Sequence, residues 1–139
     1  GLLVTTPLQM AMLASVFANG GTLYRPRLAW RAGPGEAVRE MGWPERASGL
    51  VRGGMHDVAT QGTGRRVQVR GLDVAAKTGT AEYDVGGVRR KNTWVTAFAP
   101  FDRPSAAVAI VVENGESGGL TVAPMVHDVL AAVFGEASA

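Results

Sequence analysis

The chain has 139 residues, a hydrophobic fraction of 46%, a charged fraction of 19% and a formal net charge of +2. This composition favours one packed domain, or part of one, and excludes wholesale disorder. The chain contains no cysteine, which excludes disulfides, thiolate metal ligands and a cysteine nucleophile. The small net charge, with few aromatic residues near the arginines, argues against nucleic-acid binding.

Two helices are predicted in the first 60 residues. Thr6-Pro7-Leu8-Gln9 has the pattern of a capped helix start, and Asn19-Gly20-Gly21 predicts where that helix ends. Because the helix is apolar on nearly every face, we expect it to be buried. We expect a second helix to begin with Ser48 as its cap and to run to about Thr60.

Short segments lie between and after these helices. Residues 22–30 predict a strand that is short or at an edge, because Pro26 lies within it. Residues 31–46 predict a surface connection. Residues 61–64 predict only a turn, since they lack the Gly-Lys ending of a phosphate-binding loop. The alternation of charge and valine in residues 65–70 predicts a short exposed strand.

The second half of the chain predicts three strands and a final helix. The expected order is a central strand at 72–80, a polar hairpin within 82–92, a partner strand at 94–99, a strand buried on both faces at 106–113, and a helix at 121–134. Short turns join antiparallel neighbours. The expected fold class is therefore α+β, an antiparallel sheet covered by helices, made of a meander of three C-terminal strands plus a short earlier strand.

Lys77, Thr78, Gly79 and Thr80 break the apolar pattern of the predicted central strand. One interpretation is structural: an edge strand on which a lysine disfavours pairing with another chain, with threonines that suit a strand. The functional interpretation is an anion-binding, acyl-transfer strand, with charge from Lys77, threonine hydroxyls for a carboxylate, and a glycine that lets a substrate backbone approach. The N–H of Thr80 is a candidate oxyanion donor. Strand alternation puts the threonines on one face and Lys77 and Gly79 on the other, so all four serve one cleft only if the strand edge forms its wall.

Residues 115–119 satisfy G-x-S-x-G between a strand and a helix, which is the context of a nucleophile elbow. The elbow needs an acid and then a histidine later in the chain, but only His127 and Asp128 follow, adjacent on one predicted helix. The antiparallel order also contradicts the parallel sheet of that hydrolase class. Ser117 is therefore the less favoured site, and surface or capping roles are expected for His56 and His127.

Lys77-Thr78-Gly79-Thr80-Ala81 resembles the K-T-G strand of the penicillin-binding and serine β-lactamase superfamily. Other segments resemble class B penicillin-binding proteins in the same order along the chain. They are T-P-L-Q-x-A at 6–11, A-N-G-G at 18–21, W-x-x-x-F-A-P at 94–100 and E-x-G-x-x-G-G at 113–119. The resemblance implies that residues 1–139 are the C-terminal portion of a transpeptidase domain, and that Ser117 lies in a structural loop.

The chain departs from that family in its nucleophile motifs. The family needs S-x-x-K and S-x-N, and neither begins at any serine of the chain: Ser15, Ser48, Ser105, Ser117 and Ser138. In the family both motifs lie upstream of the K-T-G strand, and the chain begins at Gly1 rather than at methionine. We therefore expect a piece of a longer protein, inactive alone, whose partner is the N-terminal remainder of the domain.

The resemblance implies that the parent protein is a peptidoglycan D,D-transpeptidase of the elongation or division type. It would attack the D-Ala-D-Ala end of a stem peptide through a serine acyl-enzyme, and β-lactam antibiotics would mimic that substrate. Lys77, Thr78, Gly79 and Thr80 would bind the terminal carboxylate, and the Thr80 N–H would stabilise the oxyanion. No metal or cofactor is implied.

The resemblance also implies a place at the extracytoplasmic face of the bacterial cell membrane, with an N-terminal anchor, and a SEDS-type glycosyltransferase as a possible partner. Two alternatives stay open. One is a non-catalytic penicillin-binding-like sensor or scaffold, and the other, less favoured, is a serine hydrolase that uses Ser117.

Overall fold

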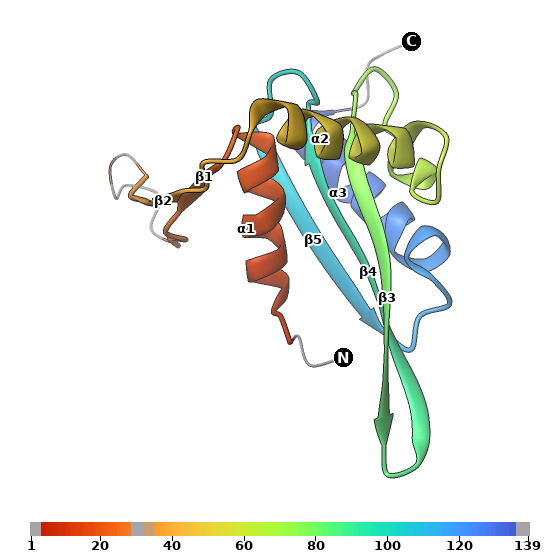
Figure 1. The fold of residues 1–139 in the computed structure, drawn as a ribbon. Helices are drawn as coiled ribbons and strands as arrows, with labels where there is room; N and C mark the ends of the chain where they lie inside the picture. Colours follow the sequence, from red (N-terminus) through yellow and green to blue (C-terminus); the bar gives the residue numbers. More distant parts are fainter. Residues whose placement is uncertain (1–3, 29–32, 34, 136–139) are drawn as a thin grey trace.

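A computed structural model describes residues 4–28, 33 and 35–135 of the chain. Three layers make up the fold: helices α1 and α2 lie on one face of an antiparallel sheet, β3-β4-β5, and helix α3 lies on the other (Figure 1). A second antiparallel sheet, β1-β2, stands to one side (Figure 1). The described elements are α1 (Pro7–Ala18), β1 (Thr22–Tyr24), β2 (Ala37–Glu40), α2 (Glu45–Thr60), the 3₁₀ turn η1 (Arg65–Val67), β3 (Ala75–Val85), β4 (Val88–Ala99), β5 (Ala106–Glu113), the π-helical turn η2 (Gly118–Val122) and α3 (Ala123–Phe134).

Helix α1 begins as its sequence predicts. The Thr6 hydroxyl accepts from the Gln9 backbone N–H at 3.2 Å, and the Gln9 side chain accepts from the Thr6 N–H at 2.9 Å. This reciprocal pair satisfies backbone donors that a helix start leaves open. The expectation of a buried helix is wrong for part of its surface, since Leu8 is 58% exposed. The side of α1 that turns away from the sheet has no covering element among the described residues.

Two predictions for residues 22–60 need correction. The expected connection at 31–46 contains β2, which pairs with β1 through Thr22 and Glu40, and residues 29–32 and 34 lie outside the described part. Helix α2 begins at Glu45, after Pro44, and not at Ser48. Proline suits a helix start because it has no N–H to leave unpaired, and an acid in the first turn suits the helix dipole. Ser48 lies inside the helix, where its hydroxyl donates to the Glu45 carbonyl.

The sheet has the predicted antiparallel neighbours in a different arrangement. Its order is β3-β4-β5, so β4 is the central strand. The expectations of a central strand at 72–80 and of a doubly buried strand at 106–113 are both wrong, because β3 and β5 are the two edges. The hairpin is longer than predicted, and β3 and β4 run on to a two-residue turn at Gly86 and Gly87. Both glycines have positive φ, as such a turn requires.

The segments on either side of the sheet also differ in detail from the sequence prediction. Residues 65–70 do not form an exposed strand: they contain η1, and Val67 and Val69 are buried. Valine alternates there because a 3₁₀ turn and an extended residue put both valines under α3. The final helix was expected to start at Thr121 or a neighbour, and it begins at Ala123 because η2 precedes it.

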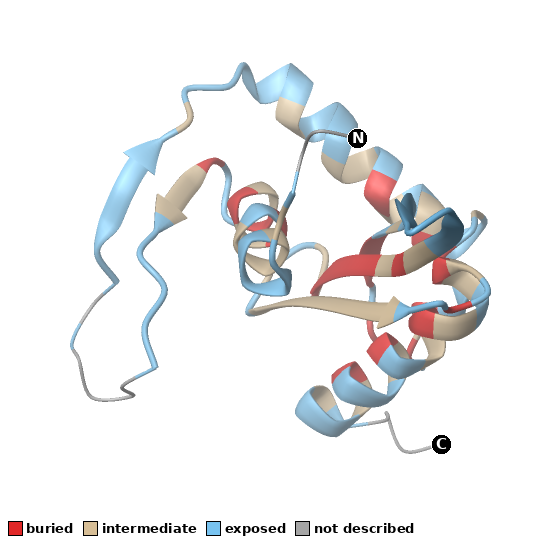
Figure 2. Ribbon diagram, turned by 90° about the horizontal axis from the view of Figure 1, so that it is seen from below, coloured by how far each residue is buried: buried red, intermediate tan, exposed pale blue. Residues whose placement is uncertain are grey.

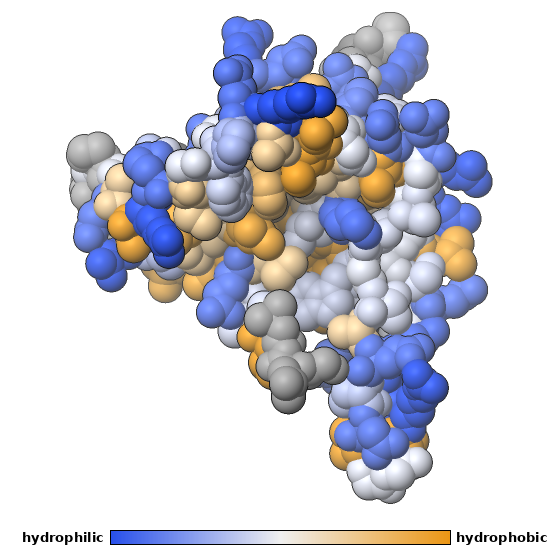
Figure 3. Space-filling view, viewed as in Figure 1, coloured by the Kyte–Doolittle hydropathy of each residue, from blue (hydrophilic) through white to orange (hydrophobic). Residues whose placement is uncertain are grey.

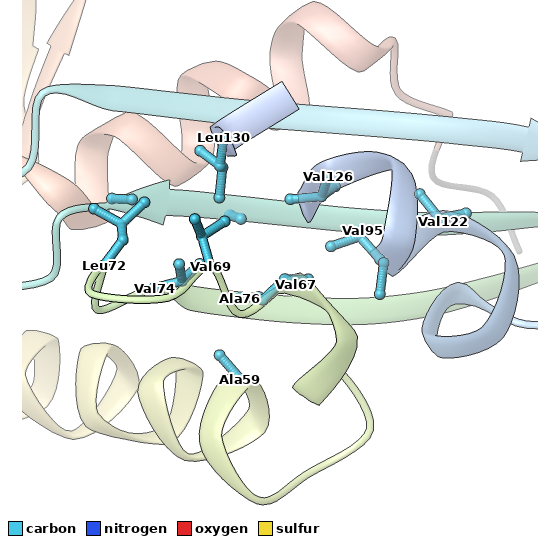
Figure 4. Packing of buried hydrophobic residues seen from close by; sticks show 13 residues of the cluster. Ala59, Val67, Val69, Leu72, Val74, Ala76, Val95, Val122, Val126 and Leu130 are labelled. Atoms are coloured by element: carbon cyan, nitrogen blue, oxygen red, sulfur yellow. The ribbon is translucent and has the colours of Figure 1, made fainter. Parts of the chain in front are cut away.

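The main core lies between the sheet and α3. Figure 2 shows the buried residues gathered where the elements face one another. Figure 4 shows the close-packed side chains of this cluster, which come from the sheet, from α3, from the end of α2, from η1 and η2, and from the segment between η1 and β3. The cluster contains Ala59, Val67, Val69, Leu72, Val74, Ala76, Val95, Ala97, Ala99, Val122, Ala123, Val126 and Leu130. A smaller cluster of Ala18, Met55, Ala75 and Phe98 lies on the α1 and α2 side.

Candidate substrate cleft at the edge of the sheet

The four residues singled out in the sequence lie side by side in the edge strand β3. Lys77 is paired with Thr96, and these two line a pocket with residues of α1 and α2. Thr78 is paired with Val95, which belongs to the core under α3. The alternation expected from the sequence is therefore present, and the two faces of β3 look toward different helices.

A cleft of about 490 Å³ runs along the free edge of β3. Because no described strand pairs with β3 on that side, residues of both of its faces reach the cleft. Thr78, Gly79 and Thr80 all line it, so the strand edge does form its wall. The other lining residues come from the loop after α2, from η1 and from the turn η2: Gly62, Thr63, Arg65, Arg66, Ser117, Gly118, Gly119 and Leu120.

Lys77 is not among the residues that line this cleft. Its ammonium group donates to the carbonyl oxygen of Thr78 at 2.6 Å. Its side chain lines a separate, largely apolar pocket of about 400 Å³ between α1 and α2. Figure 3 shows apolar side chains gathered over these two helices. The Lys77 side chain therefore lines this second pocket, while its ammonium group contacts the backbone of Thr78, which lines the cleft.

Thr63 is a cleft residue that the sequence analysis missed. Its hydroxyl oxygen lies 2.6 Å from that of Thr78, so the two hydroxyl groups share a hydrogen bond. The loop can bring Thr63 there because Gly62 and Gly64 flank it. A Cβ at Gly62 would lie 2.8 Å from the Cα of Val58, which is closer than real Cβ atoms approach. A threonine between two glycines was the only available signal, and it is a weak one.

Two further glycines let η2 close the cleft. A Cβ at Gly118 would collide with the carbonyl oxygen of Trp94 and would lie 3.2 Å from the Cβ of Thr78. A Cβ at Gly119 would collide with the carbonyl oxygen of Thr63. The glycine-rich loop therefore lies directly on the sheet and on the Thr63 loop, and backbone forms much of this side of the cleft.

Ser117 lines the cleft, but its surroundings do not match a nucleophile elbow. Its hydroxyl oxygen accepts from the Leu120 N–H at 3.1 Å, which caps η2. His127 lies elsewhere, with Nδ1 2.6 Å from the carbonyl oxygen of Gln68, and the ring of His56 packs on Phe101. Among the described residues, no histidine, aspartate or glutamate lines the cleft. A base for Ser117 is therefore not found in this part of the chain.

Across residues 4–28, 33 and 35–135, no three His, Asp or Glu side chains group closely enough to hold a metal ion. None of the described helices has the length and apolar character needed to cross a membrane.

Residues 1–131 match the family described as "Penicillin binding protein transpeptidase domain". The chain belongs to this family. It is 36% identical to the peptidoglycan D,D-transpeptidase PbpA of Mycolicibacterium smegmatis, over 96% of the chain and 30% of that protein. Family membership confirms the resemblance drawn from the K-T-G strand and its companion segments.

Two solved structures show the same fold. Penicillin-binding protein A of Mycobacterium tuberculosis, as a ceftriaxone acyl-enzyme complex, superposes with a TM-score of 0.82 at 29% identity, over 93% of this chain and 32% of that one. PBP2 of Pseudomonas aeruginosa superposes with a TM-score of 0.80 at 31% identity, over 100% of this chain and 32% of that one. The expected α+β class is confirmed, and the chain spans about a third of the length of these relatives.

Proposed function

We propose that this chain forms the substrate-binding wall of a peptidoglycan D,D-transpeptidase, at a site that β-lactams also occupy. The observation that carries the proposal is the free edge of β3, where Thr78, Gly79 and Thr80 line one cleft in a member of this family. The names of two relatives support it, one a D,D-transpeptidase and the other a ceftriaxone acyl-enzyme.

Each β3 residue has a distinct part in this proposal. The hydroxyls of Thr78 and Thr80 donate to the terminal carboxylate of a stem peptide ending in D-Ala-D-Ala. Gly79 has no Cβ, so the peptide backbone can lie along the strand edge. The Thr80 N–H donates to the oxyanion of the tetrahedral intermediate. Lys77 acts electrostatically, through the contact of its ammonium group with the Thr78 carbonyl.

The acylated serine, in this proposal, lies outside residues 1–139. None of the five serines begins an S-x-x-K motif, and Ser117, which lines the cleft, is engaged in capping η2. The chain alone is then not acylated by a fluorescent penicillin. Denaturing gel electrophoresis with mass spectrometry checks this, and a covalent adduct on any serine would contradict it.

Peptide binding tests the proposed wall directly. An N-acylated peptide ending in D-Ala-D-Ala is titrated into the chain and its affinity measured by calorimetry. Thr78→Val removes one hydroxyl at constant shape and should weaken binding by about 10- to 100-fold, the size of one lost hydrogen bond to a charged group. Thr60→Val is the matched control, because Thr60 is exposed on α2 and outside the cleft. Equal affinity of Thr78→Val and the wild-type chain would overturn the assignment.

The same proposal covers the setting of the parent protein. The exposed apolar side chains of α1 and α2 contact the N-terminal part of the domain. A membrane anchor holds the parent protein at the extracytoplasmic face of the cell membrane. There it lies beside a SEDS-type glycosyltransferase. Cross-linking in cells followed by mass spectrometry tests the partnership. Recovery of the protein from the cytoplasm, without any such glycosyltransferase, would contradict it.

A further inference from the structure

The two arginines at the start of η1 have no assigned role in the proposed site. Arg65 and Arg66 both line the cleft, and both are exposed. Within the described part of the chain, neither guanidinium has a hydrogen-bond or ion-pair partner, although Arg25 and Arg89 each pair with a glutamate. The positive charge of Arg65 and Arg66 is therefore available to a ligand.

Arg65 and Arg66 are the charged residues that line the cleft in the described part of the chain. Among its described lining residues there is no aspartate or glutamate, and Lys77 lies in the separate pocket between α1 and α2. Besides the charge of Lys77 that the sequence indicates, the cleft is lined by two arginine side chains from the same segment as Thr63. A single terminal carboxylate at Thr78 and Thr80 leaves at least one of these positive charges without a counter-charge.

We infer that Arg65 and Arg66 form a second anion subsite, and that the cleft takes peptides carrying a further carboxylate besides the terminal one. This inference rests on the proposed function, which places the terminal carboxylate at β3. Arginine suits the task because its planar group can donate two parallel hydrogen bonds to a carboxylate. The subsite then selects acidic stem peptides over otherwise equal neutral ones.

The test uses two N-acylated peptides that both end in D-Ala-D-Ala. One carries a side-chain carboxylate at the residue before the D-Ala pair, and the other carries a carboxamide of the same shape at that position. The full chain should bind the carboxylate peptide about 3- to 10-fold more tightly at low salt, in the range of exposed and partly shielded charge pairs. The preference should shrink as ionic strength rises, because salt screens exposed charges.

Variants assign the preference to residues. Arg65→Gln with Arg66→Gln should abolish it, and Arg70→Gln should leave it intact, because Arg70 is exposed nearby but outside the cleft. Equal binding of the two peptides by the wild-type chain would overturn the inference, as would a preference that survives in the double variant. The first outcome needs no variant, so a misfolded variant cannot hide it.

The result also separates this inference from the proposed function. Each peptide has a version with an amidated C-terminus. In one outcome, C-terminal amidation weakens binding while the carboxylate and carboxamide peptides bind equally well. That result would support the binding wall at β3 and would contradict the arginine subsite. If amidation changes nothing, the proposed function itself fails.

Discussion

The two faces of the sheet are held in different ways. On the α3 face, side chains such as Val95 and Leu130 are fully buried in one continuous apolar cluster. On the α1 and α2 face, the buried cluster is small, and a 400 Å³ pocket with Lys77 in its wall remains open. There the side chain of Arg52 joins the elements by donating to the carbonyl oxygens of Phe17, Ala18 and Phe101.

The α3 face therefore stabilises the fold, whereas the α1 and α2 face is accessible to a partner. A continuous apolar core supplies most of the stability of a domain and leaves little surface for contacts. The face with the open pocket instead presents apolar side chains to solvent, such as Leu50, which is 70% exposed. The cleft lies at the edge between these faces, so the packed face can position Thr78 while the strand edge stays accessible.

The largest loss of stability is predicted for a substitution in the packed α3 face of the sheet. Leu130→Ala should lower the free energy of unfolding by about 2–5 kcal/mol, because it leaves a cavity beside fully buried neighbours. Leu50→Ala is the matched change on the open face and should shift stability by less than about 0.5 kcal/mol. Urea denaturation followed by circular dichroism measures both. Equal losses would mean that the two faces do not differ as described.

A smaller effect is predicted for the polar clamp on the open face. Arg52→Met keeps an apolar stem over the rings of Phe98 and Phe101 but removes three hydrogen bonds and the charge. We expect a loss of about 2–3 kcal/mol, since partly buried carbonyl groups are left unpaired. Arg46→Met, on the exposed surface of the same helix, is the control. Matching denaturation curves for the two variants would show that the clamp contributes little.

The smallest effect is predicted for a substitution beside the free edge of β3. Thr63→Val removes the partner that fixes the Thr78 hydroxyl. Peptide affinity should fall by about 3- to 10-fold with little change in stability, because Thr63 is exposed and one neutral hydrogen bond is lost. Calorimetry with the D-Ala-D-Ala peptide measures the change, with Thr60→Val again as the control. An unchanged affinity would make the Thr63 contact incidental to binding.

Local rules predicted the local structure well. Three features depend only on residues close in the sequence. They are the capping box at Thr6 and Gln9, the turn at Gly86 and Gly87, and the strand that carries Lys77. Hydrogen bonds and backbone angles at such sites depend on near neighbours, so a sequence pattern is enough. The family resemblance then correctly joined these pieces into one fold.

Tertiary context decided what the sequence could not predict. The sequence predicted a central strand at 72–80, but β3 is an edge strand. Its apolar residues, such as Ala76, are nevertheless buried, because α3 covers that face of the sheet at the edge as well as at the centre. The roles of Thr63 and Arg66 depend on a loop folding back onto β3, and no local pattern reports that contact. For the same reason the sequence does not show that the Lys77 side chain lines the pocket between α1 and α2 while its ammonium group contacts Thr78.

The central claim is that the free edge of β3 binds a peptide through its terminal carboxylate. The most direct measurement is an amide-resolved NMR titration of the chain with an N-acylated D-Ala-D-Ala peptide and with the same peptide amidated at its C-terminus. The account predicts that the free acid shifts the resonances of Thr78, Gly79 and Thr80, and that amidation largely removes these shifts. Shifts confined to other residues, or identical responses to both peptides, would contradict it.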